Sequence, residues 1–352
     1  MGAPLRILIL SSAVGRFGEG PTGGVSRYAA GMAEALGEQG MFPVVLVPEG
    51  SEVPPGIEFV EASGNFQLSA ATADRNEHPV PAESVLARML DIAWSERENF
   101  DRIVNLNHDY LPVFSTAYFD GKLYHLPNLV TSDAATDALI RARCSEFPSQ
   151  FAAVSAFQRG RLGLPDVPVL SFGMRRQKGA VERGQYLCWS GRITPEKGLD
   201  AAAEVARQVG LPLVVAGHVE SEEYFAAIRN EYDDLIDYRG FLKLLDLSRI
   251  ISSAQAMLQT QNWEEALGLS TIEAIATGTP VVAYDRGANR EIVRDGVNGF
   301  VVEHGNVAAA AEAVRQAGGI SRQEILADFD LRFSLRSFAR RLMDWLGFTL
   351  EN

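Results

Sequence analysis

Hydrophobic and polar positions follow two different patterns along this 352-residue chain. Short apolar runs, typical of buried strands, are separated by longer stretches whose apolar residues recur with helical spacing. In the first half, strands are predicted at 6–11, 43–49, 102–107, 121–126 and 151–155. An amphipathic helix is predicted over 24–40, and the polar, irregular residues 61–82 are predicted to form a loop or lid.

The same alternation begins again after residues 171–185, a stretch rich in charge and glycine that is predicted to be a linker. Further strands are predicted at 186–191, 211–217, 236–240, 256–261, 279–285 and 299–303, with helices over 198–210, 245–254, 269–278 and 335–348. This order predicts an α/β fold with two doubly wound parallel sheets. We expect an N-terminal domain over 1–170, completed by a C-terminal helix within 335–352. A second domain is expected over 186–334, facing the first across a ligand cleft.

Composition narrows the classes of protein that the chain can represent. With 47% hydrophobic and 22% charged residues it is an ordinary globular sequence, and a net charge of −13 disfavours nucleic acid and anionic membranes as partners. Cys144 and Cys188 make no metal or disulfide spacing, which favours a reducing compartment. The first apolar run is too short for a signal peptide, and no run is long enough to span a membrane. We therefore expect a cytoplasmic protein.

A glycine-rich stretch near the start matches G-x-G-x-x-G at Gly18, Gly20 and Gly23. In a dinucleotide-binding fold the first glycine directly follows the strand, whereas here residues 13–17 intervene, so a nicotinamide oxidoreductase is disfavoured. Gly23 and Gly24 instead stand at the start of the predicted helix, where free N–H groups suit an anion. The alternative is a glycine-rich surface loop.

Two motifs of the second half predict ligand binding more strongly than the glycine-rich stretch does. Arg192 and Lys197 lie on a loop between a predicted strand and helix, and two cations there suit a diphosphate. Glu265 precedes a helix that begins near Leu269, and Glu273 lies inside that helix. The peptide N–H groups from Ala266 to Thr271 would be free to bind ligand oxygens. Taken singly, each cation can be a solvated surface residue, and Glu273 an exposed helix carboxylate.

These residues resemble a known family. EALGLSTIEAIATGTPV, residues 265–281, is similar to the motif EGFGLxxLEAMAxGxPV of the retaining glycosyltransferases of family 4, which have the GT-B fold. SGRITPEKGLD (190–200) and RGANREIVRDGVNGFVV (286–302) resemble two further motifs of that family. Ala266, Leu267 and Arg286 depart from the family pattern, and Leu267 can alter the donor pocket.

The resemblance implies a role for each matching residue. Glu273 would bind the ribose hydroxyls, Arg192 and Lys197 the diphosphate, and Glu265 the transferred sugar. The nucleobase would lie near Gly217 and residues 240–242. The implied donor-binding residues are Gly23, Gly24, Arg192, Lys197, Gly217, Gly240, Phe241, Leu242, Glu265, Ala266, Leu267, Gly268, Leu269, Ser270, Thr271 and Glu273. The implied catalytic residues are His108, Arg192, Lys197 and Glu265.

The first half offers an acceptor site. His108 follows a predicted strand at the place of the family's cleft histidine, although it can also be a structural histidine at a strand end. Asn107, Asp109, Tyr110 and Ser155 are predicted to complete the site. Residues 106–140 also resemble the corresponding stretch of tetrahydrobiopterin glucosyltransferases. This favours a pterin acceptor stacked on Tyr110, Phe114 and Tyr118, unless these aromatics belong to the core.

The resemblance implies a retaining hexosyl transfer, with UDP-glucose as the first choice of donor and no metal or other cofactor. Residues 232–234, YDD, are read as a solvated helix end rather than a metal site. Residues 1–170 carry 12 Lys and Arg against 20 Asp and Glu, a net charge of −8, which favours a small soluble acceptor over a lipid. The alternatives are a transferase for another acceptor and a non-catalytic nucleotide-sugar-binding protein.

Overall fold

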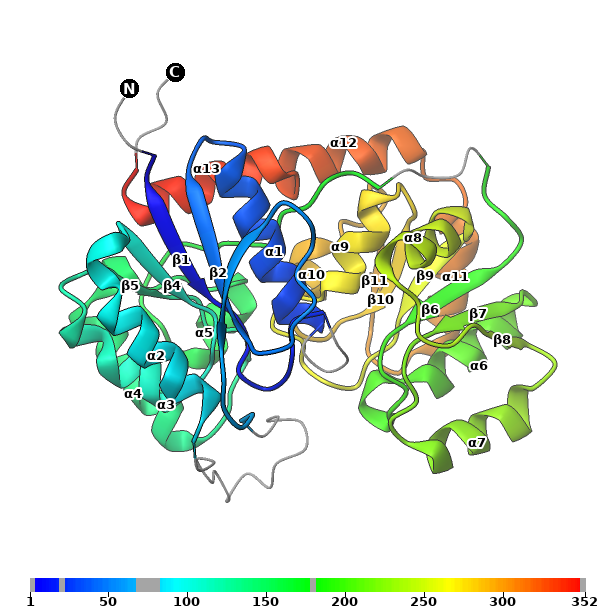
Figure 1. The fold of residues 1–352 in the computed structure, drawn as a ribbon. Helices are drawn as coiled ribbons and strands as arrows, with labels where there is room; N and C mark the ends of the chain where they lie inside the picture. Colours follow the sequence, from blue (N-terminus) through cyan, green and yellow to red (C-terminus); the bar gives the residue numbers. More distant parts are fainter. Residues whose placement is uncertain (1–3, 19–22, 68–82, 178–181, 349–352) are drawn as a thin grey trace. The chain divides into compact units, whose positions relative to one another are not determined.

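A computed structural model of the chain describes residues 4–18, 23–67, 83–177 and 182–348. The chain divides into two compact units: unit 1 comprises Met1–Gly173 and Leu335–Asn352, and unit 2 comprises Met174–Ser334. Each unit contains one parallel sheet with helices around it (Figure 1).

The sheet of unit 1 has the strand order β3-β2-β1-β4-β5, with every neighbouring pair parallel. Its strands are β1 (Arg6–Leu10), β2 (Phe42–Pro48), β3 (Glu58–Ala62), β4 (Arg102–Asn105) and β5 (Leu123–His125). The strand predicted at 151–155 is wrong, because Phe151 and Ala153 make only isolated bridges, to His125 and Val169. The loop predicted at 61–82 is wrong for residues 61 and 62, which belong to β3; residues 63–67 lie outside any helix or strand, and residues 68–82 lie outside the described part.

Helices cover both faces of this sheet (Figure 1). They are α1 (Gly23–Gly37), α2 (Val85–Ser95), α3 (Tyr110–Phe114), α4 (Ala134–Glu146), α5 (Ala156–Leu162) and α13 (Leu335–Leu346), with short 3-10 turns η2 (Arg97–Asn99), η3 (Ser115–Tyr118) and η4 (Pro148–Gln150). Leu8 and Leu10 of β1 pack with Val85 and Met89 of α2. The alternate side chains of β1 face the other way, toward the side on which α1 contacts β1 and β2.

The last helix, α13, packs against α1 within unit 1. The edge of the Phe338 ring meets the Tyr28 ring, with centroids 5.5 Å apart. A Cβ atom at Gly173 would lie 2.2 Å from the Cβ of Phe338, so this approach requires glycine. The helix predicted at 335–348 is confirmed as a helix and buries seven side chains, from Leu335 to Leu346.

The sheet of unit 2 has the order β11-β10-β9-β6-β7-β8 and is also parallel. Its strands are β6 (Leu187–Ser190), β7 (Leu213–Ala216), β8 (Ile236–Tyr238), β9 (Ala256–Gln259), β10 (Val281–Tyr284) and β11 (Gly299–Val302). All six strands predicted for this half are confirmed. Strands β6, β7, β9 and β10 can be predicted from their short apolar runs because they are almost wholly buried, as expected for a parallel sheet covered on both faces.

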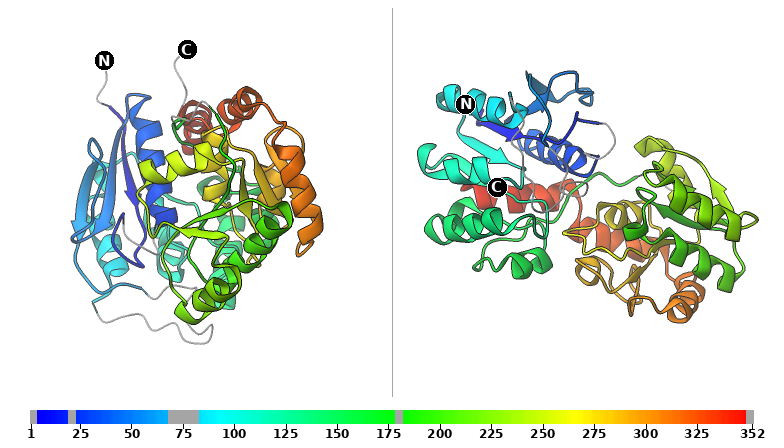
Figure 2. Two further views of the ribbon diagram at one scale, coloured as in Figure 1. Left: turned by 90° about the vertical axis from the view of Figure 1, so that its right-hand side faces the viewer. Right: turned by 90° about the horizontal axis from the view of Figure 1, so that it is seen from below.

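The helices of unit 2 are α6 (Leu199–Val209), α7 (Glu222–Tyr232), α8 (Leu244–Ser253), α9 (Leu269–Ala276), α10 (Asn289–Ile292), α11 (Val307–Ala317) and α12 (Arg322–Arg332), with the 3-10 turn η5 (Pro195–Lys197). One core joins α6, α7 and α11 to the sheet through side chains such as Trp189 and Val215. Helix α9 contacts β9 and β10 and also packs with α8 and α12. The views in Figure 2 show helices flanking each sheet. No helix in the described residues is long and apolar enough to cross a membrane.

Candidate active site

The residues predicted to bind a donor gather in the loops that follow the strands of unit 2. Arg192 and Lys197 follow β6, Gly217 follows β7, Gly240 follows β8, and Glu265 follows β9. Because the strands are parallel, these loops all lie at the carboxyl edge of one sheet, which is where doubly wound folds bind ligands.

Backbone contacts hold three of these loops together. The N–H of Gly217 donates to the carbonyl of Gly240 over 2.9 Å, and the N–H of Gly191 donates to Ala216 over 3.2 Å. A Cβ atom at Gly217 would lie 1.8 Å from the Gly191 carbonyl oxygen, so only glycine fits there. Phe241 is 62% exposed beside this backbone surface. An exposed aromatic ring next to these loops suits a flat ligand such as the predicted nucleobase.

The two predicted diphosphate-binding cations are each paired with carboxylates. The Arg192 guanidinium pairs with Glu220 and, at 3.5 Å, with Glu196. The Lys197 ammonium pairs with Glu265. A diphosphate that binds these cations must therefore take the place of carboxylate oxygens, which offer the same charge-assisted contacts.

Lys197 is fixed by the turn that carries it. Gly198 follows η5 with φ at +68°, and a Cβ atom there would lie 2.1 Å from the Thr260 carbonyl oxygen. The Thr260 hydroxyl donates to the Gly198 carbonyl over 2.7 Å. These contacts bind the loop after β6 to the loop after β9 and bring Lys197 and Glu265 together, although they lie 68 residues apart in sequence.

Helix α9 begins directly behind Glu265. Gly268 precedes it with φ at +85°, and the Glu265 carbonyl accepts the N–H of Ala288 at 3.1 Å. Glu273 is 3% exposed, so the alternative of an exposed helix carboxylate is wrong. The expectation that all N–H groups up to Thr271 are free is also wrong, because the Thr271 N–H donates to the Gly268 carbonyl over 3.2 Å.

Gln261 was not predicted as a site residue, because the apolar run placed it inside a strand. Strand β9 ends at Gln259, so Gln261 lies in the loop at the carboxyl edge. Its side chain is buried, with the residue 3% exposed, and neither its Nε2 nor its Oε1 has a hydrogen-bond partner in the parts of the chain that the structure describes. A buried amide without partners costs free energy that a bound ligand or water would recover. A polar residue directly after a buried strand is the signal that points to it.

In unit 1 the predicted acceptor residues serve largely to hold the loops. Asn107 is 7% exposed; its Oδ1 accepts the Ala13 N–H at 2.9 Å and its Nδ2 donates to the Ser11 carbonyl at 2.8 Å. Asp109 caps α3 by accepting the Leu111 N–H at 2.9 Å, and Ser155 caps α5 by accepting the Gln158 N–H at 3.0 Å. Their proposed contact with an acceptor stays a prediction.

Gly23 and Gly24 open α1, as the predicted helix requires, and the Gly23 carbonyl accepts a hydrogen bond from the Arg27 side chain at 3.0 Å.

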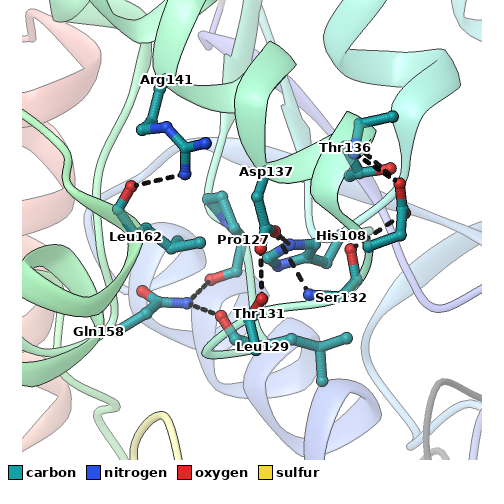
Figure 3. A network of polar contacts seen from close by, with 12 residues as sticks. His108, Pro127, Leu129, Thr131, Ser132, Thr136, Asp137, Arg141, Gln158 and Leu162 are labelled. Atoms are coloured by element: carbon teal, nitrogen blue, oxygen red, sulfur yellow. Dashed lines mark hydrogen bonds and ion pairs between the residues drawn. The ribbon is translucent and has the colours of Figure 1, made fainter. Parts of the chain in front are cut away.

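His108 lies just after β4 and pairs with Asp137 of α4. Its Nε2 is 3.1 Å from the Asp137 Oδ1, its side chain is 1% exposed, and its Nδ1 has no hydrogen-bond partner among the described residues. Figure 3 shows Thr131 and Ser132 beside the same carboxylate. The imidazole is thus buried and held by a charge rather than lying open on the surface.

Three aromatic residues follow His108 along α3 and η3. Tyr110, Phe114 and Tyr118 are 46%, 40% and 55% exposed, so the alternative that they belong to the core is wrong. The Tyr110 and Phe114 rings stack with centroids 6.1 Å apart. They form an exposed aromatic surface next to the His108 loop.

No group of three or more His, Cys, Asp or Glu side chains within the described ranges could hold a metal ion.

Comparison with known structures and sequences defines the class of fold. The crystal structure of AviGT4, described as a glycosyltransferase involved in avilamycin A biosynthesis, superposes with a TM-score of 0.73 at 21% identity, covering 98% of this chain and 97% of that one. HepE of Anabaena, solved with UDP and glucose, superposes with a TM-score of 0.74 at 16% identity, covering 97% and 99%. The expected GT-B class of α/β fold, with two parallel sheets, is confirmed.

Sequence comparison finds a family match in the second half of the chain. Residues 173–320 match the family described as glycosyl transferases group 1. The putative glycosyltransferase YtcC of Bacillus subtilis is 28% identical over 156 residues. That match spans 40% of this chain and only 38% of YtcC.

Proposed function

We propose that this protein is a retaining glycosyltransferase that moves a hexose from a nucleoside diphosphate sugar to a hydroxyl group of a small soluble acceptor. The observation that carries the proposal is the Lys197–Glu265 pair at the carboxyl edge of one parallel sheet, in the stretch that matches the group 1 family. Arg192 lies on the loop of Lys197, and Glu273 is buried in the helix that begins after Glu265. Two cations, a buried carboxylate and a helix N-terminus match the needs of a diphosphate joined to a ribose and a sugar.

UDP-glucose is the donor that we propose first. HepE, which shares this fold, was solved with UDP and glucose. In the proposed complex Arg192 and Lys197 neutralise the charge that develops on the leaving diphosphate, so the reaction needs no divalent ion. Glu273 binds the ribose hydroxyls and Glu265 binds the hydroxyls of the transferred hexose.

Retention follows if the acceptor attacks from the face that the diphosphate leaves. The bond from the anomeric carbon to the diphosphate oxygen breaks, the bond to the acceptor oxygen forms, and the acceptor proton passes to the departing diphosphate. No nucleophile from the protein is required in this scheme.

For the acceptor we propose a pterin such as tetrahydrobiopterin. The exposed aromatic residues Tyr110, Phe114 and Tyr118 offer ring surfaces to a flat heterocycle, and they begin two residues after His108. Unit 1 carries more acidic than basic residues, which disfavours an anionic membrane as the source of the acceptor. Both cysteines are buried free thiols, so we also propose a reducing, cytoplasmic location.

The test is to incubate the protein with UDP-glucose and tetrahydrobiopterin and to measure UDP release and the hexose adduct by mass spectrometry. We expect an α-linked adduct, detected by the anomeric coupling in its NMR spectrum. Lys197→Ala should lower transfer strongly, whereas Lys122→Ala, which removes an ion-paired lysine of unit 1, should not. UDP binding without transfer to any acceptor would favour the non-catalytic binding protein. Transfer to a polyprenyl or glycerolipid acceptor instead would overturn the pterin proposal.

A further inference from the structure

We propose that Asp137 is a positioning residue for His108: its carboxylate holds the imidazole with the proton on Nε2 and reserves Nδ1 as an acceptor for a hydroxyl group of a bound substrate. This inference rests on the proposed function, and it adds Asp137, which lies outside the three family 4 motifs at 190–200, 265–281 and 286–302.

The geometry fixes one side of the ring. The His108 Nε2 lies 3.1 Å from the Asp137 Oδ1, within hydrogen-bond distance, and the two residues lie 29 positions apart in sequence. His108 comes from the loop after β4 and Asp137 from the first turn of α4. The contact therefore exists only because the fold brings these two elements together.

The carboxylate is itself held from several directions. The Thr131 hydroxyl donates to Asp137 Oδ2, and the Ser132 N–H donates to Oδ1 at 3.3 Å (Figure 3). Burial raises the pKa of Asp137, but the hydrogen bonds from His108, Thr131 and Ser132 outweigh it and hold that pKa below its ordinary value. Asp137 is therefore ionised at neutral pH, and an ionised carboxylate only accepts hydrogen bonds.

The loop that supplies Thr131 is in turn anchored to α5. The Gln158 side chain donates to the carbonyl groups of Pro127 and Leu129, at 2.7 Å each (Figure 3). It also accepts the Val154 N–H at 2.9 Å. Asp137 itself lies on α4, and the loop that carries Thr131 is held by α5. The position of the carboxylate is therefore fixed by both helices.

An acceptor-only partner at Nε2 determines the tautomer of His108. Nε2 carries the proton, so in the neutral ring Nδ1 has a lone pair. That Nδ1 is buried and has no partner within the described ranges. A buried polar atom left in this state costs free energy, which a hydroxyl group of a ligand would recover.

A second histidine of the same unit shows what a purely structural one looks like here. His125 is fully buried, and both ring nitrogens have partners: Asn105 Nδ2 at 3.3 Å from Nδ1 and Thr116 Oγ1 at 3.0 Å from Nε2. Both partners are uncharged. His108 differs in having a carboxylate on one nitrogen and, among the residues that the structure describes, no partner on the other, which is the arrangement of an oriented functional imidazole.

The first measurement reads the tautomer directly. Long-range proton–nitrogen NMR of protein with ¹⁵N-labelled histidine, at a pH where the ring is neutral, should show the His108 Nε2 protonated and Nδ1 unprotonated. The His108→Gln variant assigns the signals. In Asp137→Asn, whose amide can also donate, the His108 signals should shift toward the other tautomer. Asp133→Asn is the matched control, because it removes a carboxylate on the same helix end while asparagine keeps the cap. It should leave the signals unchanged.

The second measurement reads the consequence for transfer. We expect Asp137→Asn to lower kcat by roughly 10- to 100-fold with KM changed far less, because the ring is still present but wrongly oriented. Thr131→Val, which removes one donor to the carboxylate, should lower kcat in the same direction by a smaller factor. It also keeps the test open should Asp137→Asn fail to fold.

An unprotonated Nε2 in the wild-type protein would overturn the proposal, as would a kcat of a folded Asp137→Asn within twofold of wild type. If the wild-type protein transfers no hexose to any acceptor, the proposed function fails, and with it the substrate contact at Nδ1. The tautomer measurement then decides separately whether Asp137 holds the ring.

Discussion

Replacing Glu265 with glutamine should strengthen the binding of UDP while it weakens sugar transfer. In the structure the Glu265 carboxylate forms an ion pair with the Lys197 ammonium, which is proposed to bind the diphosphate. Glutamine keeps the size of the side chain and removes its charge, so Lys197 is released from its partner. UDP lacks the transferred hexose, so its affinity excludes the contact that Glu265 is proposed to make with the hexose hydroxyls.

The size of the effect follows from the exposure of the pair. The side chains of Lys197 and Glu265 are 20% and 28% exposed, so solvent screens their attraction. An ion pair of this kind contributes about 0.2–1 kcal/mol, which corresponds to a UDP affinity roughly 1.5- to 5-fold higher in Glu265→Gln. The gain should shrink as salt is added. Transfer should fall, because glutamine is a weaker partner for the hydroxyls of the hexose.

Isothermal titration calorimetry with UDP, together with kcat for UDP-glucose, measures both quantities. Glu312→Gln is the matched control, since Glu312 pairs with Arg315 at 3.3 Å on α11. It should change neither quantity. A UDP affinity in Glu265→Gln that falls more than twofold would refute the reasoning, because the carboxylate would then support the nucleotide instead of competing with it. Unchanged turnover would remove Glu265 from the proposed catalytic set.

Four further outcomes are expected. Gly217→Ala should lower the melting temperature by several degrees, because its Cβ would lie 1.8 Å from the Gly191 carbonyl oxygen; an unchanged melt would show that the loops are not tightly packed. Burial lowers the pKa of His125 from 6.5 to about 3. Below pH 6.5 the imidazole therefore binds a proton in the unfolded chain but not in the folded chain. The free energy of unfolding should fall as the pH drops from about 6.5 toward 3. At pH 5 the protonation of His125 in the unfolded chain lowers the free energy of unfolding by about 2 kcal/mol. Denaturant unfolding should show a weaker pH dependence for His125→Gln, and equal dependence would contradict the assignment. Gln261→Leu should raise the melting temperature of the free protein, because a buried amide without partners is removed, and should reduce the shift produced by UDP-glucose; an undiminished shift would exclude a donor contact. Excess EDTA should leave transfer unchanged, and a loss restored by a divalent ion would contradict the metal-independent scheme.

The sequence predicted the sheet of unit 2 more completely than that of unit 1, for a physical reason. Strands β7, β9 and β10 of unit 2 are wholly buried, so each is a distinct apolar run. Strand β3 is not recognisable in the sequence because it lies at the sheet edge, where Phe59 and Val60 are 44% and 42% exposed and stand between Glu58 and Glu61. The apolar residues 151–155 resemble a strand in sequence, yet their burial comes from packing rather than from strand pairing.

The sequence predicts some residues of the candidate site but not others. Arg192 and Glu265 could be predicted because they stand next to recognisable strands and helix starts, where position along the chain fixes position in space. Asp137 could not, because nothing local marks one carboxylate of α4 as the partner of a histidine on another loop. The pairing of Lys197 with Glu265 likewise depends on how the Gly198 turn packs against Thr260, which no motif spacing reveals.

The binding of a nucleoside diphosphate at the carboxyl edge of unit 2 is the most direct test of the account. Thermal unfolding should be followed with UDP, GDP and ADP, each for the wild-type protein, Lys197→Ala and Lys122→Ala. A nucleotide at a hundredfold excess over its Kd stabilises the folded state by about 2.7 kcal/mol, so one of the three should raise the melting temperature clearly. We expect UDP to do so in the wild type and in Lys122→Ala, with the shift largely lost in Lys197→Ala. No shift with any nucleotide, or an equal shift in Lys197→Ala, would contradict the proposed donor site.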